Sequence, residues 1–259
     1  MSQPASSSLK NWSRRLVAAA FLGGQALLHL LTGKIHRRNT LEQLRLVGPE
    51  SLGIILLTAA TIGMVFTIQV AAEFLRFGIG SAVGGVLAIA LGREIAPLIT
   101  AVVLAGRVGS AFAAEIGTMQ VTEQIDALYI LKTDPVDYLV VPRMIACCVM
   151  TPISTLLSFV TGMLGGLILS DWVYNISNVV FLDSARTLLT PYDLVCSLIK
   201  GVVFGGLIAI IGCSWGLTTT GGAKGVGQST TTAVVTALLL IFISNFFLSW
   251  IMFSILKQP

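Results

Sequence analysis

The chain has 259 residues, of which 55% are hydrophobic and 11% are charged, and its formal net charge is +4. Its mean hydropathy is +0.89. Soluble domains average about 25% charged residues, so this composition excludes a soluble globular protein and indicates a membrane protein.

The N-terminal region carries an excess of basic side chains. Seven of the 16 lysines and arginines precede residue 46, and Glu42 is the one acid there. Because basic segments next to a span stay in the cytoplasm, we expect residues 1–45 to be cytoplasmic. Residues 9–33 show an amphipathic pattern between basic flanks, which favours a helix lying in the membrane interface. A transmembrane span is the alternative, although the uncharged run 16–33 is barely long enough to cross.

Apolar runs long enough to cross a bilayer follow along residues 46–259. A helical span requires about 20 predominantly apolar residues. Uncharged runs of this kind lie at 51–72, 144–170, 201–223 and 225–256. A further stretch, 77–114, is interrupted only by Arg93, Glu94 and Arg107. The sequence therefore predicts an all-α, polytopic membrane helix bundle with about five transmembrane helices.

Tracing these spans from a cytoplasmic N-terminus orients the connecting segments. The segments near 74–80 and 171–192 fall outside, and the loops near 115–143 and 217–228 fall inside. The outer segments hold few basic residues, as the positive-inside rule requires.

Four charged residues fall within or next to a predicted span. They are Arg93, Glu94, Arg107 and Glu115. An ionisable group in a bilayer costs several kcal/mol, so such groups face a bundle interior or a wet cavity. Arg107 and Glu115 lie about 12 Å apart along a helix, so each requires a partner on another helix or at the membrane surface. For Arg93 and Glu94, structural ion pairing and lining a substrate path both remain open.

Small residues recur at every fourth position of the same segment. Ala105, Gly109, Ala113 and Gly117 form a ridge on one helix face. Such ridges permit close backbone approach between helices in lipid. We expect the ridge to pack within the chain, and a symmetric dimer seam is the alternative.

Residues 121–132 continue beyond this span as an amphipathic segment. Four apolar residues fall on one face and two acids fall elsewhere: Val121, Ile125, Leu128 and Tyr129, and Glu123 and Asp126. The pattern predicts a short cytoplasmic helix with an exposed apolar face. Such a helix docks a soluble partner or rests on lipid.

Other candidate motifs predict no chemistry. The stretch GGAKGVGQST, residues 221–230, lacks the Gly-Lys-Ser/Thr ending of a phosphate-binding loop and lies between spans. We interpret it as a flexible cytoplasmic turn, with residues 229–232 capping the last span. The four cysteines lack metal-like spacing, and the chain has only two histidines, His29 and His36. We therefore expect no metal site, no cofactor and no catalytic centre.

The run GREIAPLITAVVLAGRVGSAFAAEIGTMQVTEQIDALYILKTDPVDYLVVPR, residues 92–143, resembles the MlaE family of ABC-transporter permeases. The similarity extends from about residue 40 to the end, so residues 46–259 are expected to form the permease domain. The resemblance implies a homodimer that works with a separate ABC ATPase, an MCE-domain protein outside and no nucleic acid. It also implies a phospholipid or other glycerolipid cargo. It further implies that residues 121–132 are the coupling helix that contacts the ATPase. The expected location is a bacterial inner (plasma) membrane, with a plastid inner envelope as the alternative.

We expect the cargo path to be a cavity shared by two copies of the chain. Arg93, Glu94, Phe246 and Phe247 are the candidate lining residues. A secondary transporter or channel for a small amphipathic solute is the competing function, but no inverted repeat is visible. An enzyme that acts on lipid is disfavoured because no paired acid and nucleophile with a histidine base is present.

Overall fold

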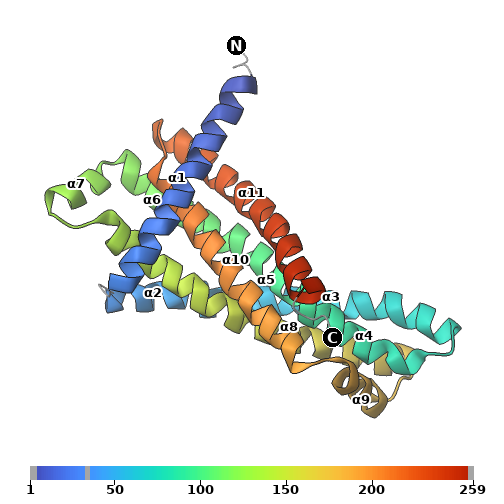
Figure 1. Cartoon of the computed structure of the whole chain (residues 1–259). Helices are drawn as coiled ribbons and strands as arrows, with labels where there is room; N and C mark the ends of the chain where they lie inside the picture. Colours follow the sequence, from blue (N-terminus) through green and yellow to red (C-terminus); the bar gives the residue numbers. More distant parts are fainter. Residues whose placement is uncertain (1–4, 33–35, 256–259) are drawn as a thin grey trace. The chain divides into compact units, whose positions relative to one another are not determined.

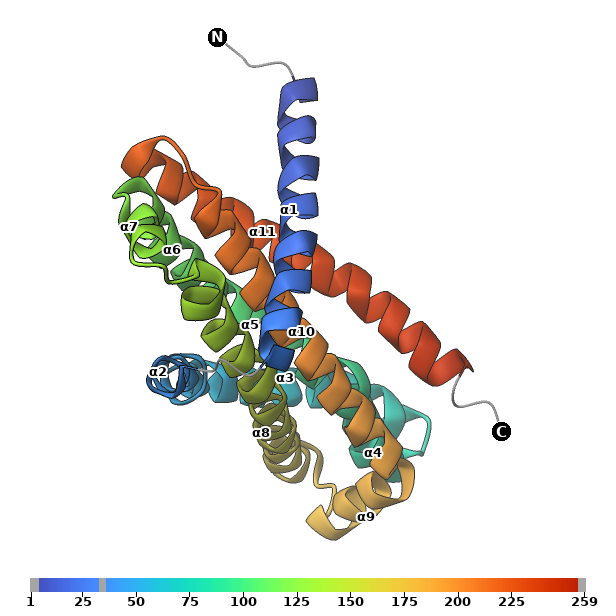
Figure 2. The same cartoon turned by 60° about the vertical axis from the view of Figure 1, so that its left-hand side comes forward.

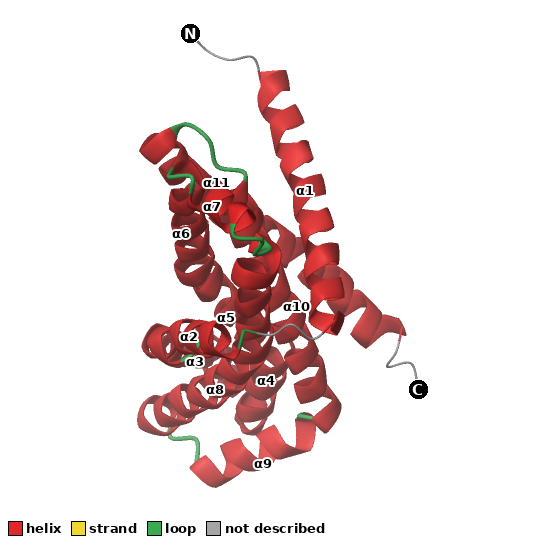
Figure 3. Ribbon diagram, turned by 90° about the vertical axis from the view of Figure 1, so that its left-hand side faces the viewer, coloured by secondary structure: helices red, strands yellow, loops and turns green. Residues whose placement is uncertain are grey.

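The computed structural model describes residues 5–32 and 36–255 (Figure 1). Helices joined by short loops make up these ranges, and no β-strand occurs in them (Figure 3). The prediction of an all-α protein is confirmed. Residue 33, the last of the predicted interfacial segment, and residues 256–259 of the predicted permease domain lie outside the described residues.

The α-helices are α1 (Ala5–Thr32), α2 (Arg37–Val47), α3 (Pro49–Arg76), α4 (Val83–Ala90), α5 (Ala96–Leu104), α6 (Ser110–Val121), α7 (Gln124–Ile130), α8 (Val141–Tyr174), α9 (Asn178–Leu188), α10 (Pro191–Leu217) and α11 (Gly222–Ser249). A short 3-10 turn, η1 (Gly80–Ala82), precedes α4. Four π-helical segments interrupt or extend the longer helices: η2 (Leu91–Ile95), η3 (Ala105–Gly109), η4 (Val136–Val140) and η5 (Trp250–Ile255).

Five continuous helical stretches are long and apolar enough to cross a membrane. They are Arg37–Arg76, Gly80–Val121, Val136–Tyr174, Pro191–Leu217 and Gly222–Ser254. The prediction of about five transmembrane helices is confirmed. The described part of the chain thus forms a polytopic membrane protein.

Helix α1 is helical as predicted and is not one of the five spanning candidates among the described residues. Its polar side chains bond to protein: Arg15 donates to the carbonyl of Thr218, and His29 bonds to Asp137. Apolar side chains such as Phe21 are exposed instead. An exposed apolar stripe is typical of a helix that lies against lipid, and that location stays a prediction.

The chain divides into two compact units. The first unit comprises Met1–Val47, Leu104–Val149 and Gly205–Leu240, and the second comprises Gly48–Val103, Met150–Phe204 and Ile241–Pro259.

In the first unit, the small-residue ridge lies against α10. All four ridge residues are buried. A Cβ on Gly212 would lie 3.0 Å from the carbonyl oxygen of Gly109, and one on Gly216 would lie 2.7 Å from Ile116. The small residues therefore bring α10 into backbone contact with η3 and α6 within one chain.

Three local expectations for the first unit are wrong. The amphipathic segment is shorter than 121–132, because Thr122 ends α6 and Glu123 takes a left-handed conformation with φ of 59° before α7 begins. Residues 222–230 are helical rather than a flexible turn. Gly221 and Gly222, with φ of 89° and 65°, let the chain reverse within a few residues, so α11 begins earlier than predicted. The threonines at 230–232 do not cap α11, since their hydroxyls donate to carbonyls one turn earlier.

The second unit is built on close contacts of α3 with α8 and of α4 with α9. Figures 1 and 2 both show α9 beside α4. The core between these helices is apolar and contains Leu87, Leu91 and Phe181. Helices α3 and α8 meet at glycines, where a Cβ on Gly63 would lie 2.0 Å from the carbonyl oxygen of Gly162. Nothing larger than glycine fits at that crossing without a backbone shift.

The α3–α8 crossing gives a stability test. We expect Gly63→Ala to lower the thermal unfolding temperature, because the added methyl overlaps backbone and overpacking costs about 1–3 kcal/mol. Gly53→Ala on the same helix is the matched control, since nothing lies within 4 Å of its Cβ position. The control should be neutral or slightly stabilising, because alanine favours helix by about 1 kcal/mol. Equal unfolding temperatures for both variants in detergent would contradict the tight crossing.

Candidate functional site

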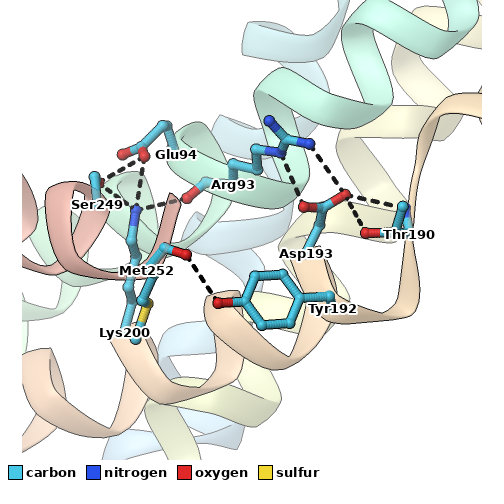
Figure 4. Close-up of polar contacts among 8 residues, drawn as sticks. All are labelled: Arg93, Glu94, Thr190, Tyr192, Asp193, Lys200, Ser249 and Met252. Carbon is cyan, nitrogen blue, oxygen red and sulfur yellow. Dashed lines mark hydrogen bonds and ion pairs between the residues drawn. The ribbon is translucent and has the colours of Figure 1, made fainter. Parts of the chain in front are cut away.

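Segment η2 presents two charged side chains in the second unit. Arg93 and Glu94 both lie in this π-helical segment, which places an extra residue in one turn of the span. Such π-bulges are rare and occur frequently at functional sites. Both residues find their partners on α10, so they do not form a pair with each other (Figure 4).

Arg93 forms an ion pair with Asp193. The Nε of Arg93 donates to Oδ1 of Asp193 at 2.9 Å, and Nη2 donates to Oδ2 at 3.4 Å. Thr190 donates to the same Oδ2 from its backbone nitrogen at 3.0 Å and from its hydroxyl at 2.8 Å. The carboxylate of Asp193 is therefore held from both sides, with a cation on one and the start of α10 on the other.

Glu94 forms the second ion pair, with Lys200. The ammonium of Lys200 donates at 2.8 Å to three acceptors: Oε1 of Glu94, the hydroxyl of Ser249 and the carbonyl of Arg93. Ser249 donates in turn to Oε1 of Glu94 at 2.7 Å, and Asn245 donates to Oε2 at 2.9 Å. All three donors of the lysine are used, which is what a buried ammonium requires.

These six side chains form what we call the polar network: Arg93, Glu94, Asp193, Lys200, Asn245 and Ser249. Its two cations and two anions cancel, so the network carries no net charge. Asp193 and Lys200 are fully buried, whereas the side chains of Arg93 and Glu94 are 29% and 40% exposed. The network thus has a sealed side on α10 and an accessible side on η2.

Aromatic groups cover part of the network. The ring of Phe253 lies 5.0 Å from the guanidinium of Arg93 and 5.7 Å from the ammonium of Lys200. Tyr192 packs edge-on against Phe253 and donates its hydroxyl hydrogen to the carbonyl of Met252. Cation–π contact stabilises both cations without adding charge.

One polar atom of the network has no partner among the described residues. It is Oδ1 of Asn245, a buried amide oxygen. On the same helix, Phe246 and Phe247 are exposed and contact each other edge-on. On α11, a buried polar atom with spare hydrogen-bonding capacity is therefore followed directly in sequence by two exposed aromatic residues.

The other two predicted intramembrane charges lie in the first unit. Glu115 pairs with Arg143 of α8 at 2.7 Å, and Arg143 also donates to the carbonyl of Leu139. Arg143 is buried and lies over the ring of Phe112. Arg107 lies in η3 and also has an interaction partner. Glu115 thus finds its partner on another helix, whereas its separation from Arg107 along the chain excluded direct pairing.

Helix α7 exposes a different apolar set from the one expected. Ile125 is 3% exposed, so the prediction that it lies on an exposed face is wrong. The left-handed turn at Glu123 reorients the segment and directs Ile125 inward. Tyr129, Ile130 and Leu131 are the exposed apolar side chains, and Ile130 is 81% exposed. Val121 and Leu128 are half-buried, and Asp126 is exposed.

A histidine and two aspartates also meet in the first unit. One donor atom each from His29, Asp134 and Asp137 lies within 4.8 Å of the others. Two protein contacts already use this group: His29 bonds to Asp137, and Asp134 accepts from the backbone nitrogen of Val136. The contact between His29 and Asp137 ties α1 to η4.

Comparison with known proteins places this arrangement in a family. A model of the family "Permease MlaE" matches residues 40–251. The chain belongs to the MlaE permease family. It is 65% identical over 247 residues to a probable ABC transporter permease protein of Synechocystis sp., covering 95% of this chain and 94% of that protein. It is 52% identical over 258 residues to the chloroplastic protein TRIGALACTOSYLDIACYLGLYCEROL 1 of Arabidopsis thaliana, covering 98% and 74%. A probable ABC transporter permease protein of Porphyra purpurea is 50% identical over 246 residues, covering 95% and 94%.

Family membership makes this MlaE permease a transport subunit rather than an enzyme. The sequence predicted Arg93 and Glu94 as site residues but did not identify their ion-pair partners, Asp193 and Lys200. One signal was available: these two charges lie seven residues apart just before the predicted run 201–223, a spacing that puts both on one face if the helix begins earlier, and their signs are opposite to those of the adjacent pair. The polar residues Asn245 and Ser249 gave no comparable signal, because four-residue spacing of uncharged side chains is common in spans.

The buried ion pair gives a second stability test. We expect Arg93→Gln to destabilise the MlaE permease by about 3–5 kcal/mol, because it leaves the fully buried carboxylate of Asp193 without its cation. The double variant Arg93→Gln/Asp193→Asn should recover most of that loss, since no charge is left unpaired. Thermal unfolding of the purified permease measures both.

Arg76→Gln is the matched control for this test. Arg76 pairs with Glu73 at 3.0 Å, but both side chains are largely exposed, and such pairs contribute about 0–1 kcal/mol. The ion-pair interpretation fails if Arg93→Gln unfolds at the temperature of this control, or if the double variant is less stable than the single one.

Proposed function

We propose that this chain is the permease subunit of an ATP-driven transporter that moves phospholipids or other glycerolipids. In this proposal the chain forms a homodimer, a separate ABC ATPase binds its cytoplasmic side, and an MCE-domain protein receives or delivers the lipid outside. The membrane is a bacterial inner membrane or a plastid inner envelope. Family membership supports the ATPase partner, and the name of the Arabidopsis relative contains that of a galactolipid.

One observation carries the assignment of a lipid cargo. The accessible side of the polar network, formed by Arg93 and Glu94, is linked through the amide of Asn245 to α11, where the next two residues, Phe246 and Phe247, have exposed rings. A lipid presents the same combination, with hydrogen-bonding headgroup atoms next to hydrocarbon. A site for a small ion does not require exposed aromatic side chains, and a purely apolar path does not require paired charges.

The parts of the network take different roles in this proposal. Arg93 and Glu94 face the cargo path and exchange hydrogen bonds with a passing headgroup, and Asn245 holds Glu94 from α11. Asp193 and Lys200 are positioning residues, since they are fully buried and touch the cargo only through the partners that they hold. Because the network is neutral before the lipid arrives, a weakly bound headgroup can leave again, as transport requires.

Helix α7 is the proposed contact with the ATPase. It lies between two spanning stretches and exposes Tyr129, Ile130 and Leu131 next to the exposed acid Asp126. Apolar anchors with a charged rim are typical of protein interfaces. Ile125, Leu128 and Val121 support the helix from its inner side in this proposal.

A photo-crosslinking experiment tests the cargo path. We expect a benzophenone amino acid at position 247, in the complex assembled with its ATPase, to capture lipid with a yield that changes severalfold on addition of ATP. Position 195 is the matched control, because Val195 and Phe247 are each 51% exposed and both belong to the second unit. A benzophenone at position 195 should capture only the lipid that surrounds the protein, so its yield should not change when ATP is added. Capture at 247 that never responds to ATP in an active complex would remove the case for this path.

A binding experiment tests the ATPase contact. We expect Ile130→Asp to weaken co-purification of the ATPase by about thirtyfold, because interface anchors contribute about 2 kcal/mol or more. The change affects an exposed residue, so the permease should remain folded. Thr122→Asp controls for the added charge, since Thr122 is exposed just before α7. Normal ATPase binding by the Ile130 variant, or equal loss with both variants, would rule out an apolar contact at this position.

A further inference from the structure

An apolar cavity in the second unit is lined by none of the residues proposed for the cargo path. Its volume is about 540 Å³, and its lining comes from α4, the second half of α8, α9 and the beginning of α10. Phe159, Met163 and Leu167 of α8 line it together with Leu182, Leu189 and Leu194. Sites for small organic ligands have volumes of about 300–1,000 Å³, so the cavity has the capacity for a flexible hydrocarbon chain.

The lining contains one charged side chain, Arg186 of α9. Within the described ranges, Arg186 has no hydrogen-bond or ion-pair partner. Asp183, one turn earlier on α9, is exposed and makes no ion pair with it. The other polar side chain of the lining, Thr190, already donates its hydroxyl hydrogen to Asp193. Arg186 therefore offers all of its donors to whatever occupies the mouth of the cavity.

The position of α9 in the chain places Arg186 at the level of lipid headgroups. Helix α9 connects the spanning stretches Val136–Tyr174 and Pro191–Leu217. Trp172, near the end of the first of these, is 83% exposed. Exposed tryptophans mark the boundary between hydrocarbon and headgroups, and Asn178 begins α9 just beyond that boundary. The cavity beneath α9 thus opens where a lipid would have its polar end at Arg186 and its chains directed along α8.

We propose that this cavity is a lipid-binding site that holds one acyl chain of an anionic lipid, with the headgroup phosphate bound by Arg186. The guanidinium group matches phosphate because it donates two parallel hydrogen bonds to two oxygens. A transmembrane helix of a partner is about 10–12 Å across and requires an open trough along its length. A cavity of about 540 Å³ fits an alkyl chain better. The bound lipid is a resident of the permease and is not the cargo that passes the polar network.

The experiment measures lipids retained by the full chain in nanodiscs and in native mass spectrometry. The probes are phosphatidylglycerol, which is anionic, and monogalactosyldiacylglycerol, which is neutral, with identical acyl chains. We expect Arg186→Gln to reduce the retention of phosphatidylglycerol by about tenfold, the effect of losing a charge-assisted contact, and to leave the neutral lipid unchanged. Arg76→Gln is the control, because Arg76 is also exposed but pairs with Glu73.

A second variant tests the cavity itself. Val160 lines the cavity and is 51% exposed. Val160→Phe should therefore fill part of the cavity without overpacking the buried core. This variant should reduce the retention of both lipids while the unfolding temperature stays unchanged. Retention of phosphatidylglycerol that is unaffected by both variants would mean that only bulk lipid covers this surface, and it would overturn the proposal. Failure of lipid transport in polar-network variants leaves this result untouched, so the two proposals are tested separately.

Discussion

Two ion pairs between η2 and α10 set the constraint on which the second unit depends. Asp193 and Lys200 are fully buried in a largely apolar span, and each is stable there only because a charge of opposite sign meets it. The two partners lie about 10 Å apart along α10, whereas Arg93 and Glu94 are adjacent. A slip of α10 by one helical turn would break both pairs together. The ion pairs therefore fix the register of α10 against η2, and the π-helical turn directs the two neighbouring side chains to partners on different levels.

Close packing by glycine supports this register. Gly201, next to Lys200, lies where a Cβ would be 2.9 Å from the Cα of Pro152, so α10 approaches α8 at the level of the buried ammonium. Helices α3 and α8 meet even more closely, since a Cβ on Gly63 would lie 2.0 Å from the carbonyl oxygen of Gly162. In lipid, where apolar side chains gain little from leaving the solvent, such contacts supply the attraction between helices. Polar pairing specifies which register forms, and glycine packing makes that register compact.

The sequence predicts the spans well because length and hydropathy are local properties. It also identifies Arg93 and Glu94, since isolated charges in apolar runs are visible without knowledge of the fold. Their partners depend on which helices meet, and hydrophobic periodicity contains no information about that. The same limit explains Ile125, whose burial follows from one left-handed residue at Glu123. The glycine-rich stretch 221–230 was misjudged for the opposite reason: its composition suggests a loop, but two glycines with positive φ complete the turn and the rest continues as helix.

A polar network with no net charge suits a path for lipids. A single unpaired charge would bind a headgroup strongly and then retain it, whereas paired charges offer only the hydrogen-bonding capacity left at their edges. Here that capacity lies at Arg93 and Glu94, whose side chains are partly exposed, while Asp193 and Lys200 are saturated. Thr190 connects this network to the apolar cavity, because it lines the cavity and donates its hydroxyl hydrogen to Asp193. A lipid chain resting in the cavity would touch the residue that orients Asp193, so occupancy of the resident site and the geometry of the Arg93–Asp193 pair depend on one shared side chain.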